Sequence, residues 1–162
     1  MIIGNGDIAS AIKDKKDLLF FASGVSNSKE IRESEYDREA DLLMKQDRNK
    51  HIVYFSSLCV FYSKTRYARH KNMMELFIKA NFEHNTIIRL GNITWGNNPN
   101  TIINFFRNQK KNNKPIEIRD EYRYIVSIEE FQHWINLIPD WSCEMNITGR
   151  MLSIKKIVEE FV

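Results

Sequence analysis

The stretch from His51 to Phe82 reads HIVYFSSLCVFYSKTRYARHKNMMELFIKANF. Its first part, His51–Leu58, is an apolar run of the kind that forms a strand buried on both faces. Its last part, Thr65–Phe82, carries apolar residues at helical spacing, namely Met73, Leu76, Phe77 and Ala80. A buried strand followed by a helix is typical of an α/β protein with a parallel sheet.

Segments on either side of this stretch continue the alternation of strands and helices. The predicted core strands are Met1–Ile3, Leu18–Ala22 within DLLFFAS, His51–Ser56, and Thr86–Leu90 within NTIIRLGNITWG. A half-exposed strand is expected at Lys114–Asp120, where polar and apolar residues alternate. The other predicted helices are Asp7–Lys16, one within Ser28–Asn49, Asn100–Asn108, Ser127–Ile138 and Leu152–Val162. Ser127 and Ser153 are expected to cap the last two.

Composition narrows the classes of protein that this chain can be. Its 162 residues and 43% hydrophobic content predict one globular domain, residues 1–162. The net charge of +3 is small, and the one basic stretch, Asn108–Pro115, is interpreted as a solvated loop and not as a nucleic-acid patch. No apolar run approaches the roughly 20 residues of a membrane span, and the first residues do not resemble a signal peptide. No nucleic-acid or membrane partner is therefore expected.

Cysteine and histidine usage adds two expectations. Cys59 lies among apolar residues and is interpreted as a buried thiol, and Cys143 is far from it in the sequence. Without a disulfide framework, a reducing, cytoplasmic location is expected. The four histidines have no ligand spacing, so we expect surface or satisfied, partly buried positions for them and no metal site.

A glycine-rich turn follows the first predicted strand. The residues Gly4-Asn5-Gly6-Asp7-Ile8-Ala9 fit the pattern G-x-G-x-x-(G/A). Such glycines allow a tight turn and close approach of a pyrophosphate, and the helix that follows offers free N–H donors. An ordinary strand–helix turn remains the alternative. The carboxylate of Asp7 would repel a phosphate unless it points away.

Tyr67 and Lys71 are four residues apart and therefore lie on one face of the predicted helix. A free phenol has a pKa near 10, and a neighbouring ammonium lowers that pKa toward a useful range for proton transfer. Ser57 ends the strand that precedes this helix, so its hydroxyl can hold a substrate oxygen opposite Tyr67. The alternative interpretation of Tyr67 and Lys71 is a pair on a helix surface.

Together these segments resemble the extended short-chain dehydrogenase/reductase family, in particular the NAD-dependent epimerases and dehydratases that act on nucleotide sugars. IIGNGDIA resembles the family's cofactor turn, IVYFSSLCVF the strand that bears the catalytic serine, YARHK the Tyr-x-x-x-Lys pair and IIRLGNITWG the strand that follows. YRYIVSIEEF and MNITGRMLSIKKIVEEF are similar to later family segments. The resemblance implies a reduced Rossmann-like parallel sheet flanked by helices, with a truncated substrate-binding part.

The resemblance also implies functional residues and partners. Tyr67 would be the acid/base, Lys71 would bind the nicotinamide ribose and lower the Tyr67 pKa, and Ser57 would orient the substrate. NAD or NADP would contact Gly4, Asn5, Gly6, Asp7, Ile8, Ala22 and Ser23. A homodimer through the Tyr67–Lys71 helix is implied as well, with Met73, Met74 and Phe77 as contact residues if they are not core.

The chain departs from the family pattern on the adenosine side of the expected cofactor site. An acidic residue normally holds the ribose about 20 positions after the glycines, whereas Leu18–Lys29 contains none and Glu30 is the first candidate. The loop between Ser57 and Tyr67 is also short. Three alternatives therefore stay open: an NAD(P)-dependent enzyme acting on a nucleotide sugar, a binding module or partner subunit without turnover, and a structural protein that keeps only the fold.

Overall fold

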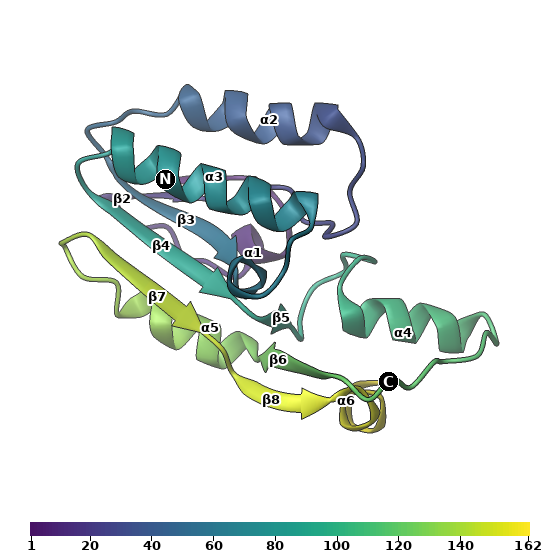
Figure 1. Ribbon diagram of the computed structural model, residues 1–162. Helices are drawn as coiled ribbons and strands as arrows, with labels where there is room; N and C mark the ends of the chain where they lie inside the picture. The colour runs from purple at the N-terminus through teal and green to yellow at the C-terminus, as the bar shows by residue number, and fades with distance from the viewer.

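A five-stranded parallel sheet forms the centre of the computed structural model, which describes residues 1–162 (Figure 1). The strand order is β1-β2-β3-β4-β7. The strands are β1 (Ile2–Ile3), β2 (Leu18–Phe21), β3 (His51–Ser57), β4 (Asn85–Leu90) and β7 (Cys143–Ile147). All four predicted core strands are present, and β3 and β4 are parallel neighbours, as predicted, with Ile52 beside Asn85 and Ser57 beside Leu90. The prediction of a Rossmann-like α/β fold is therefore confirmed.

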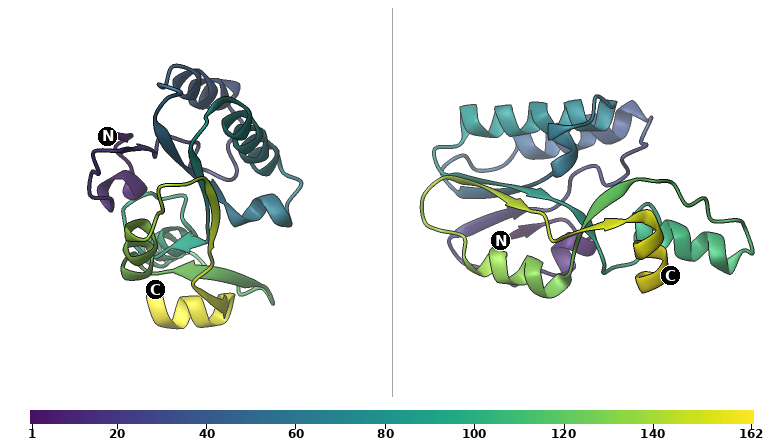
Figure 2. Two further views of the ribbon diagram at one scale, coloured as in Figure 1. Left: turned by 90° about the vertical axis from the view of Figure 1, so that its left-hand side faces the viewer. Right: turned by 60° about the horizontal axis from the view of Figure 1, so that its bottom comes forward.

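Helices cover both faces of this sheet (Figures 1 and 2). Helices α2 (Glu33–Met44) and α3 (Arg66–Asn81) pack on one face. The one-turn helix α1 (Asp7–Ser10), the residues just after it, and helix α5 (Ile128–Asn136) lie against the other face. Thr65 caps α3 by accepting a hydrogen bond from the N–H of Ala68, which fixes where the helix with Tyr67 and Lys71 begins.

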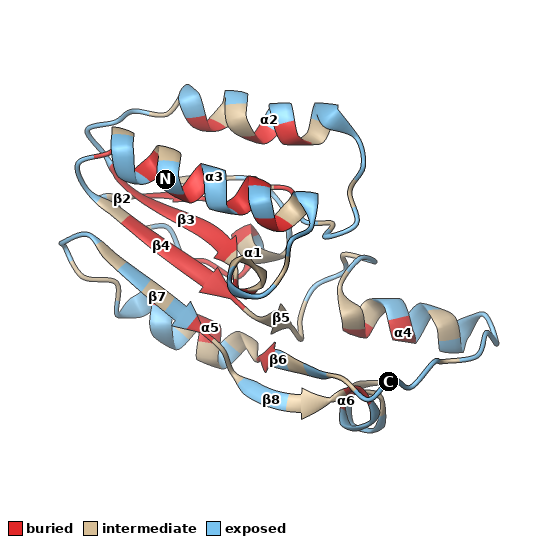
Figure 3. Cartoon of the chain, viewed as in Figure 1, coloured by how far each residue is buried: buried red, intermediate tan, exposed pale blue.

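The apolar runs of β2 and β3 reflect burial on both faces of the sheet, which Figure 3 shows in red. Successive side chains of a strand point to opposite faces. Phe20 and Val53 accordingly belong to the core under α5, whereas Leu19, Phe21 and Tyr54 belong to the core under α2 and α3. Two layers of helices therefore favour strands that are apolar on both faces.

A second, smaller layer follows the main sheet in the chain. It consists of β5 (Asn92–Ile93), β6 (Tyr122–Val126) and β8 (Arg150–Ser153), in the order β5-β6-β8. Helices α4 (Ile102–Lys111) and α6 (Ile154–Phe161) pack on it. These elements share a third core cluster, made of Ile103, Phe106, Ile125, Ile154 and Ile157. No helix of the chain has the length and apolar content to cross a bilayer.

Several predicted segments differ from the structure. The helix expected at Asp7–Lys16 ends at Ser10, because Ala11 and Ile12 turn into the core and the amino group of Met1 donates to the Leu18 carbonyl at 2.8 Å. The strand expected at Lys114–Asp120 is wrong, since this segment has no strand partner. Strands β6, β7 and β8 were not predicted, because charged and polar residues interrupt their apolar pattern. The predicted caps Ser127 and Ser153 are confirmed.

Phe20 of β2 is fully buried in the core under α5. Truncating its side chain should therefore lower the free energy of unfolding by a large amount. We expect Phe20→Ala to lower the free energy of unfolding by about 3–5 kcal/mol, because it leaves a cavity in a packed layer. Phe105→Ala is the matched control, since Phe105 is 45% exposed on α4. Denaturant unfolding measures both, and equal losses would contradict the assignment of Phe20 to the core.

Candidate functional site: a cleft at the carboxyl ends of the strands

One cleft of about 1010 Å³ lies where the chain leaves β1, β2, β3 and β4. In open α/β sheets, ligands bind outside the carboxyl ends of the strands. The residues predicted from sequence that line this cleft are Asn5, Gly6, Asp7, Ile8, Ala22, Ser23, Ser57, Tyr67 and Lys71. The fold therefore brings the glycine turn and the Ser57, Tyr67 and Lys71 group to one cavity, although the two groups are some 50 residues apart in the sequence.

The two glycines of the turn have different surroundings. Gly4 has a φ of +121°, and a Cβ there would lie 2.4 Å from the Ala22 carbonyl oxygen, so only glycine fits. Gly4 does not line the cleft; it lets the turn after β1 pack against the end of β2. A Cβ at Gly6 would meet nothing within 4 Å. Gly6 therefore leaves open space beside the backbone, which fits the close approach of a pyrophosphate.

The side chain of Asp7 is directed toward another loop. Its carboxylate oxygens accept hydrogen bonds from the backbone N–H groups of Asn97 and Asn98, at 3.0 and 2.9 Å. The indole of Trp95 donates to the Asp7 carbonyl at 3.0 Å. The carboxylate is thus occupied in joining the glycine turn to the loop after β5, which reduces its repulsion toward an anion at Gly6.

The adenosine side of the cleft lacks an acidic residue, as the sequence indicated. Glu30, the first candidate, does not line the cleft and instead binds Arg32 through two hydrogen bonds of 2.9 and 2.7 Å. Arg32 holds the Glu30 pKa down at about 2. The strand β1 is the edge of the sheet, so no further strand stands beside the glycine turn to supply a ribose contact. The cleft therefore fits the pyrophosphate part of a dinucleotide better than its adenosine part.

Tyr67 and Ser57 approach the cleft from α3 and from the end of β3. Ser57 accepts a hydrogen bond from the N–H of Cys59 at 3.3 Å and begins the short 3₁₀ helix Leu58–Phe61. Burial raises the pKa of the Tyr67 phenol above its usual value, and the nearby Cys59 and Glu39 raise it further, while the Ser57 hydroxyl opposes the rise. The expectation that the Tyr67 pKa is lowered is therefore wrong for the protein without a ligand.

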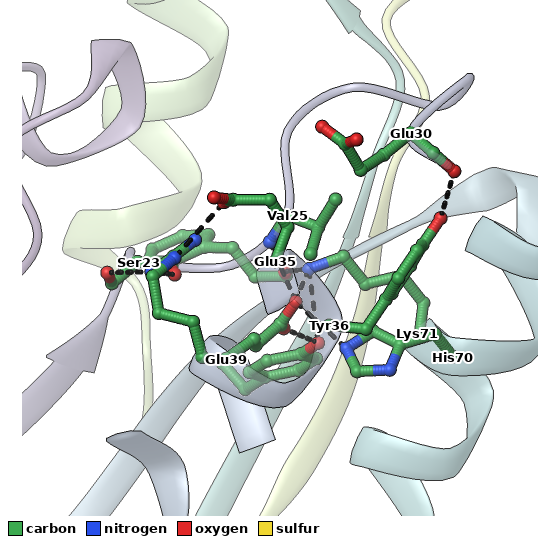
Figure 4. Close-up of polar contacts among 11 residues, drawn as sticks. Ser23, Val25, Glu30, Glu35, Tyr36, Glu39, His70 and Lys71 are labelled. Atoms are coloured by element: carbon green, nitrogen blue, oxygen red, sulfur yellow. Dashed lines mark hydrogen bonds and ion pairs between the residues drawn. The ribbon is translucent and has the colours of Figure 1, made fainter. Parts of the chain in front are cut away.

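Lys71 does not offset this rise in the Tyr67 pKa because its ammonium is bound by other partners, which Figure 4 shows. Lys71 is only 2% exposed, and its ammonium donates to Glu39 Oε1 at 3.0 Å, to Tyr54 Oη at 3.1 Å and to the Phe55 carbonyl at 3.5 Å. An ammonium has three N–H donors, and all three have acceptors here. The charge of Glu39 also cancels that of Lys71, so little of it is left to stabilise a Tyr67 phenolate.

Glu39 is fully buried, and its four hydrogen bonds come from the loop after β2, from β3 and from two residues of α3. Oε1 accepts from Lys71 and from the Tyr54 hydroxyl at 2.5 Å, while Oε2 accepts from the Val25 N–H at 2.7 Å and bonds His70 Nε2 at 3.1 Å. Burial alone would raise the Glu39 pKa, but Lys71 and these hydrogen bonds hold it well below its usual value. Glu39 is therefore ionised at neutral pH.

The ion pair between Lys71 and Glu39 lies directly beneath the loop that follows β2. A Cβ at Gly24 would lie 2.4 Å from Lys71 Nζ and 2.9 Å from Glu39 Oε1, so the loop rests on the ion pair only because this residue is glycine. Arg38, next to Glu39 on α2, donates to the Ser23 carbonyl at 3.0 Å and to its hydroxyl at 3.2 Å. Helix α2 thus positions the wall of the cleft that carries Ala22 and Ser23.

Sequence reasoning did not find Glu39, although a signal existed. Among the apolar residues of Ser28–Asn49, Ile31 and Met44 are 84% and 50% exposed and do not mark the buried face. The buried face of α2 is instead Tyr36, Glu39 and Leu43, a spacing of three and then four residues. A charged residue between two residues of a buried face indicates a buried partner of opposite charge.

The structure also places the cysteine and histidine residues considered in the sequence. Cys59 is only partly buried and lines the cleft, so the expectation of a buried core thiol is wrong. His51 is buried and satisfied by Thr86 Oγ1 at 2.8 Å. No three His, Cys, Asp or Glu side chains are grouped so that they could hold a metal ion.

Solved structures share the fold of this chain. WbmG of Bordetella bronchiseptica, crystallised with NAD and UDP, matches with a TM-score of 0.64 and 14% identity over 88% of this chain and 54% of that chain. UDP-glucose 4-epimerase of Thermus thermophilus, in complex with NAD, matches with a TM-score of 0.64 and 15% identity over 88% of this chain and 60% of that chain. dTDP-4-dehydrorhamnose reductase of Bacillus anthracis, in complex with NADP, matches with a TM-score of 0.63 and 15% identity over 88% of this chain and 61% of that chain.

These comparisons confirm the resemblance at the level of the fold: the chain has the Rossmann-type fold of nucleotide-sugar epimerases and reductases. It spans between half and two thirds of the length of these proteins. No protein-family model and no curated protein matches the sequence.

The buried pair predicts a pH-dependent effect of removing Lys71. Lys71→Met leaves Glu39 buried and unpaired, so we expect a loss of about 3–5 kcal/mol in unfolding free energy at neutral pH. In the wild type the lowered Glu39 pKa adds stability that is present above pH 4.5, the ordinary value, and is lost as the pH falls below it. In the variant burial raises the Glu39 pKa, so the deficit shrinks as the pH falls from neutral to below 4.5.

Denaturant unfolding at several pH values measures this deficit. Lys79→Met is the matched control, because Lys79 lies on the same helix with a 38% exposed side chain and pairs with Glu144 at the surface. We expect the control to lose less than about 1 kcal/mol. A Lys71→Met deficit that is the same at neutral and acid pH would contradict the assigned charge of Glu39.

Proposed function

We propose that this chain is an NAD(P)-dependent domain that oxidises, reduces, epimerises or dehydrates a nucleotide sugar at Ser57, Tyr67 and Lys71. The observation that carries the proposal is the cleft at the carboxyl ends of β1 to β4, which is lined both by the glycine turn and by these three residues. The similar solved structures include WbmG with NAD and UDP, a UDP-glucose 4-epimerase with NAD and a dTDP-4-dehydrorhamnose reductase with NADP, which supports the choice of cofactor and substrate class.

Tyr67 is proposed as the proton donor at the substrate. Its raised pKa keeps the phenol protonated at neutral pH, which suits donation to a substrate oxygen better than abstraction of a proton. Ser57, at the end of β3, would hold the same oxygen. A bound nicotinamide would supply the hydride chemistry.

Lys71 can contact a ligand only by exchanging one of its present acceptors. The Phe55 carbonyl, at 3.5 Å, is the longest of the three contacts and so the weakest. A ribose hydroxyl is proposed to take that position while Glu39 and Tyr54 remain bound. Lys71 then keeps its buried pair and adds a hydrogen bond that fixes the cofactor.

On the cofactor side, the pyrophosphate of NAD or NADP is proposed to lie beside Gly6 and the N–H groups of Asp7 and Ile8, with Ala22 and Ser23 along the opposite wall. Helix α1 has only four residues and contributes a small dipole. With no carboxylate for the adenosine ribose, the expected affinity is modest.

A second function is favoured by the saturated ammonium of Lys71. If Lys71 does not exchange an acceptor, the cleft would hold a nucleotide or nucleotide sugar without turnover, as a binding module or partner subunit. Binding of NAD(H), NADP(H) and a panel of nucleotide sugars by calorimetry, followed by turnover assays on the ligands that bind, distinguishes the two proposals.

A cytoplasmic homodimer through α3 is also proposed. Met73 and Leu76, three residues apart on that helix, are 60% and 62% exposed and together offer an apolar contact for a second copy. Met74, considered as a contact residue from the sequence, is buried in the core under α2 and α3.

Gly6→Val tests the cofactor proposal. The added side chain would project into the open space beside Gly6 without displacing the fold, so dinucleotide affinity should fall below detection while unfolding stays unchanged. Calorimetric titration with NADH and NADPH measures it. Ser10→Val is the control, because Ser10 is exposed on the same short helix and does not line the cleft. Unchanged affinity in Gly6→Val would show that the turn is only structural.

Tyr67→Phe tests the catalytic proposal. It removes the hydroxyl and keeps the ring, so folding should survive while turnover falls roughly 100-fold or more, the scale of lost general acid–base catalysis. Turnover is followed by nicotinamide absorbance and by chromatography of the sugar nucleotide. Tyr62→Phe, at an exposed tyrosine of the same cleft, should retain activity. Wild-type activity in Tyr67→Phe would refute the assignment.

A further inference from the structure

Glu39 contacts the candidate reaction centre and the candidate cofactor wall at the same time. One carboxylate oxygen binds Lys71 and the other binds the backbone N–H of Val25, in the loop after β2 (Figure 4). Neighbouring Arg38 binds Ser23 in the same loop. The loop and Lys71 are therefore fixed relative to each other through one side chain of α2.

We propose that Glu39 is a positioning residue of the candidate site: it holds Lys71 against the Ser23–Val25 loop and neutralises the ammonium beside Tyr67. This inference rests on the proposed function, because it assigns a role within the same cleft. Glu39 is not itself among the residues that line the cleft, so it acts through Lys71 and the loop.

The hydrogen bonds of Glu39 leave it no alternative arrangement. A carboxylate offers about four lone-pair positions, and Lys71, Tyr54, Val25 and His70 occupy all of them at 2.5 to 3.1 Å. Each partner comes from a different segment or a different helical position, so the carboxylate cannot rotate without breaking buried hydrogen bonds. The position of the Lys71 ammonium follows from this fixed carboxylate.

Charge is the second part of the proposal. Lys71 Nζ lies 5.8 Å from the centre of the Tyr67 ring, near enough to stabilise a phenolate if its charge were not cancelled. The titratable groups that act on Tyr67 come from α2, β3, the 3₁₀ helix and α3, namely Tyr36, Glu39, Tyr54, Cys59 and Lys71. Among them Glu39 is the one carboxylate, so its removal changes the charge at Tyr67 most directly.

A second buried ion pair provides the matched comparison. Glu75 is 2% exposed on α3 and binds Arg89 of β4 through hydrogen bonds of 2.6 to 3.1 Å. Neither Glu75 nor Arg89 lines the cleft, although Ser56, whose hydroxyl donates to Glu75 Oε1 at 2.5 Å, does. Loss of Glu75 therefore imposes a similar burial and charge defect without acting on Lys71 or on the Ser23–Val25 loop.

Glu39→Gln and Glu75→Gln are compared with the wild type as ligand-free full chains. Tyrosine labelled with ¹³C at Cζ is titrated by NMR, and the Tyr67 signal is assigned by its absence in Tyr67→Phe. Lys71 reactivity is measured by limiting acetylation with acetic anhydride and peptide mass spectrometry, with exposed Lys155 as the internal reference.

Glu39→Gln should lower the Tyr67 pKa by about one unit or more, a tenfold rise in ionised fraction at a given alkaline pH. It should also raise Lys71 acetylation relative to Lys155 by about tenfold, and Glu75→Gln should change neither. A folded Glu39→Gln protein whose Lys71 acetylation relative to Lys155 equals that of the wild type overturns the proposal. So does an equal response of Glu75→Gln.

Gly24→Ala keeps the proposal testable if Glu39→Gln does not fold. This variant changes no charge, and its methyl carbon would lie 2.4 Å from Lys71 Nζ and 2.9 Å from Glu39 Oε1, so the ammonium must shift from its present position. Lys71 acetylation should rise here too, and an unchanged value overturns the proposal. Titration of the wild type with NADH and NADPH tests the proposed function separately. If the wild type binds neither dinucleotide while the variants still show the expected Tyr67 and Lys71 responses, the proposed function is refuted and the role of Glu39 stands.

Discussion

An ionised carboxylate in a protein interior must have every lone pair satisfied, and this constraint governs the structure around Glu39. Its four donors come from the loop after β2, from β3 and from two positions on α3. Helices α2 and α3 are thereby fixed on the same face of the sheet. The apolar core stabilises this layer in general, but the carboxylate decides which residues face one another within it.

The constraint extends to the chemistry that the cleft can support. Lys71 would be expected to activate Tyr67, yet its ammonium is held by an opposite charge, and burial raises the Tyr67 pKa. The ligand-free cleft therefore presents a neutral phenol beside a compensated ion pair. Such a site can donate a proton at neutral pH, and any stronger activation requires a ligand to change the contacts of Lys71.

The sequence predicted the parallel core because β2, β3 and β4 are buried on both faces, which leaves continuous apolar runs. It also indicated residues that line the cleft, because the glycine turn and the Tyr-x-x-x-Lys pair resemble motifs of a known family. Strands β6 to β8 could not be predicted, because their faces are partly exposed and their patterns are broken by residues such as Arg123 and Glu144. Glu39 was missed because a charged residue in a polar helix is normally solvated, and only its contact with Lys71 shows otherwise.

The packing of Gly24 over this pair links three positions that are far apart in the chain. Any side chain at residue 24 would occupy space that Lys71 Nζ and Glu39 Oε1 now fill, at 2.4 and 2.9 Å from its first carbon. A shorter residue at 71 would open that space but leave the carboxylate unpaired, and a neutral residue at 39 would leave the ammonium unpaired. The three positions are therefore subject to one joint selection pressure, and among homologous sequences glycine, glutamate and lysine should be replaced together or not at all.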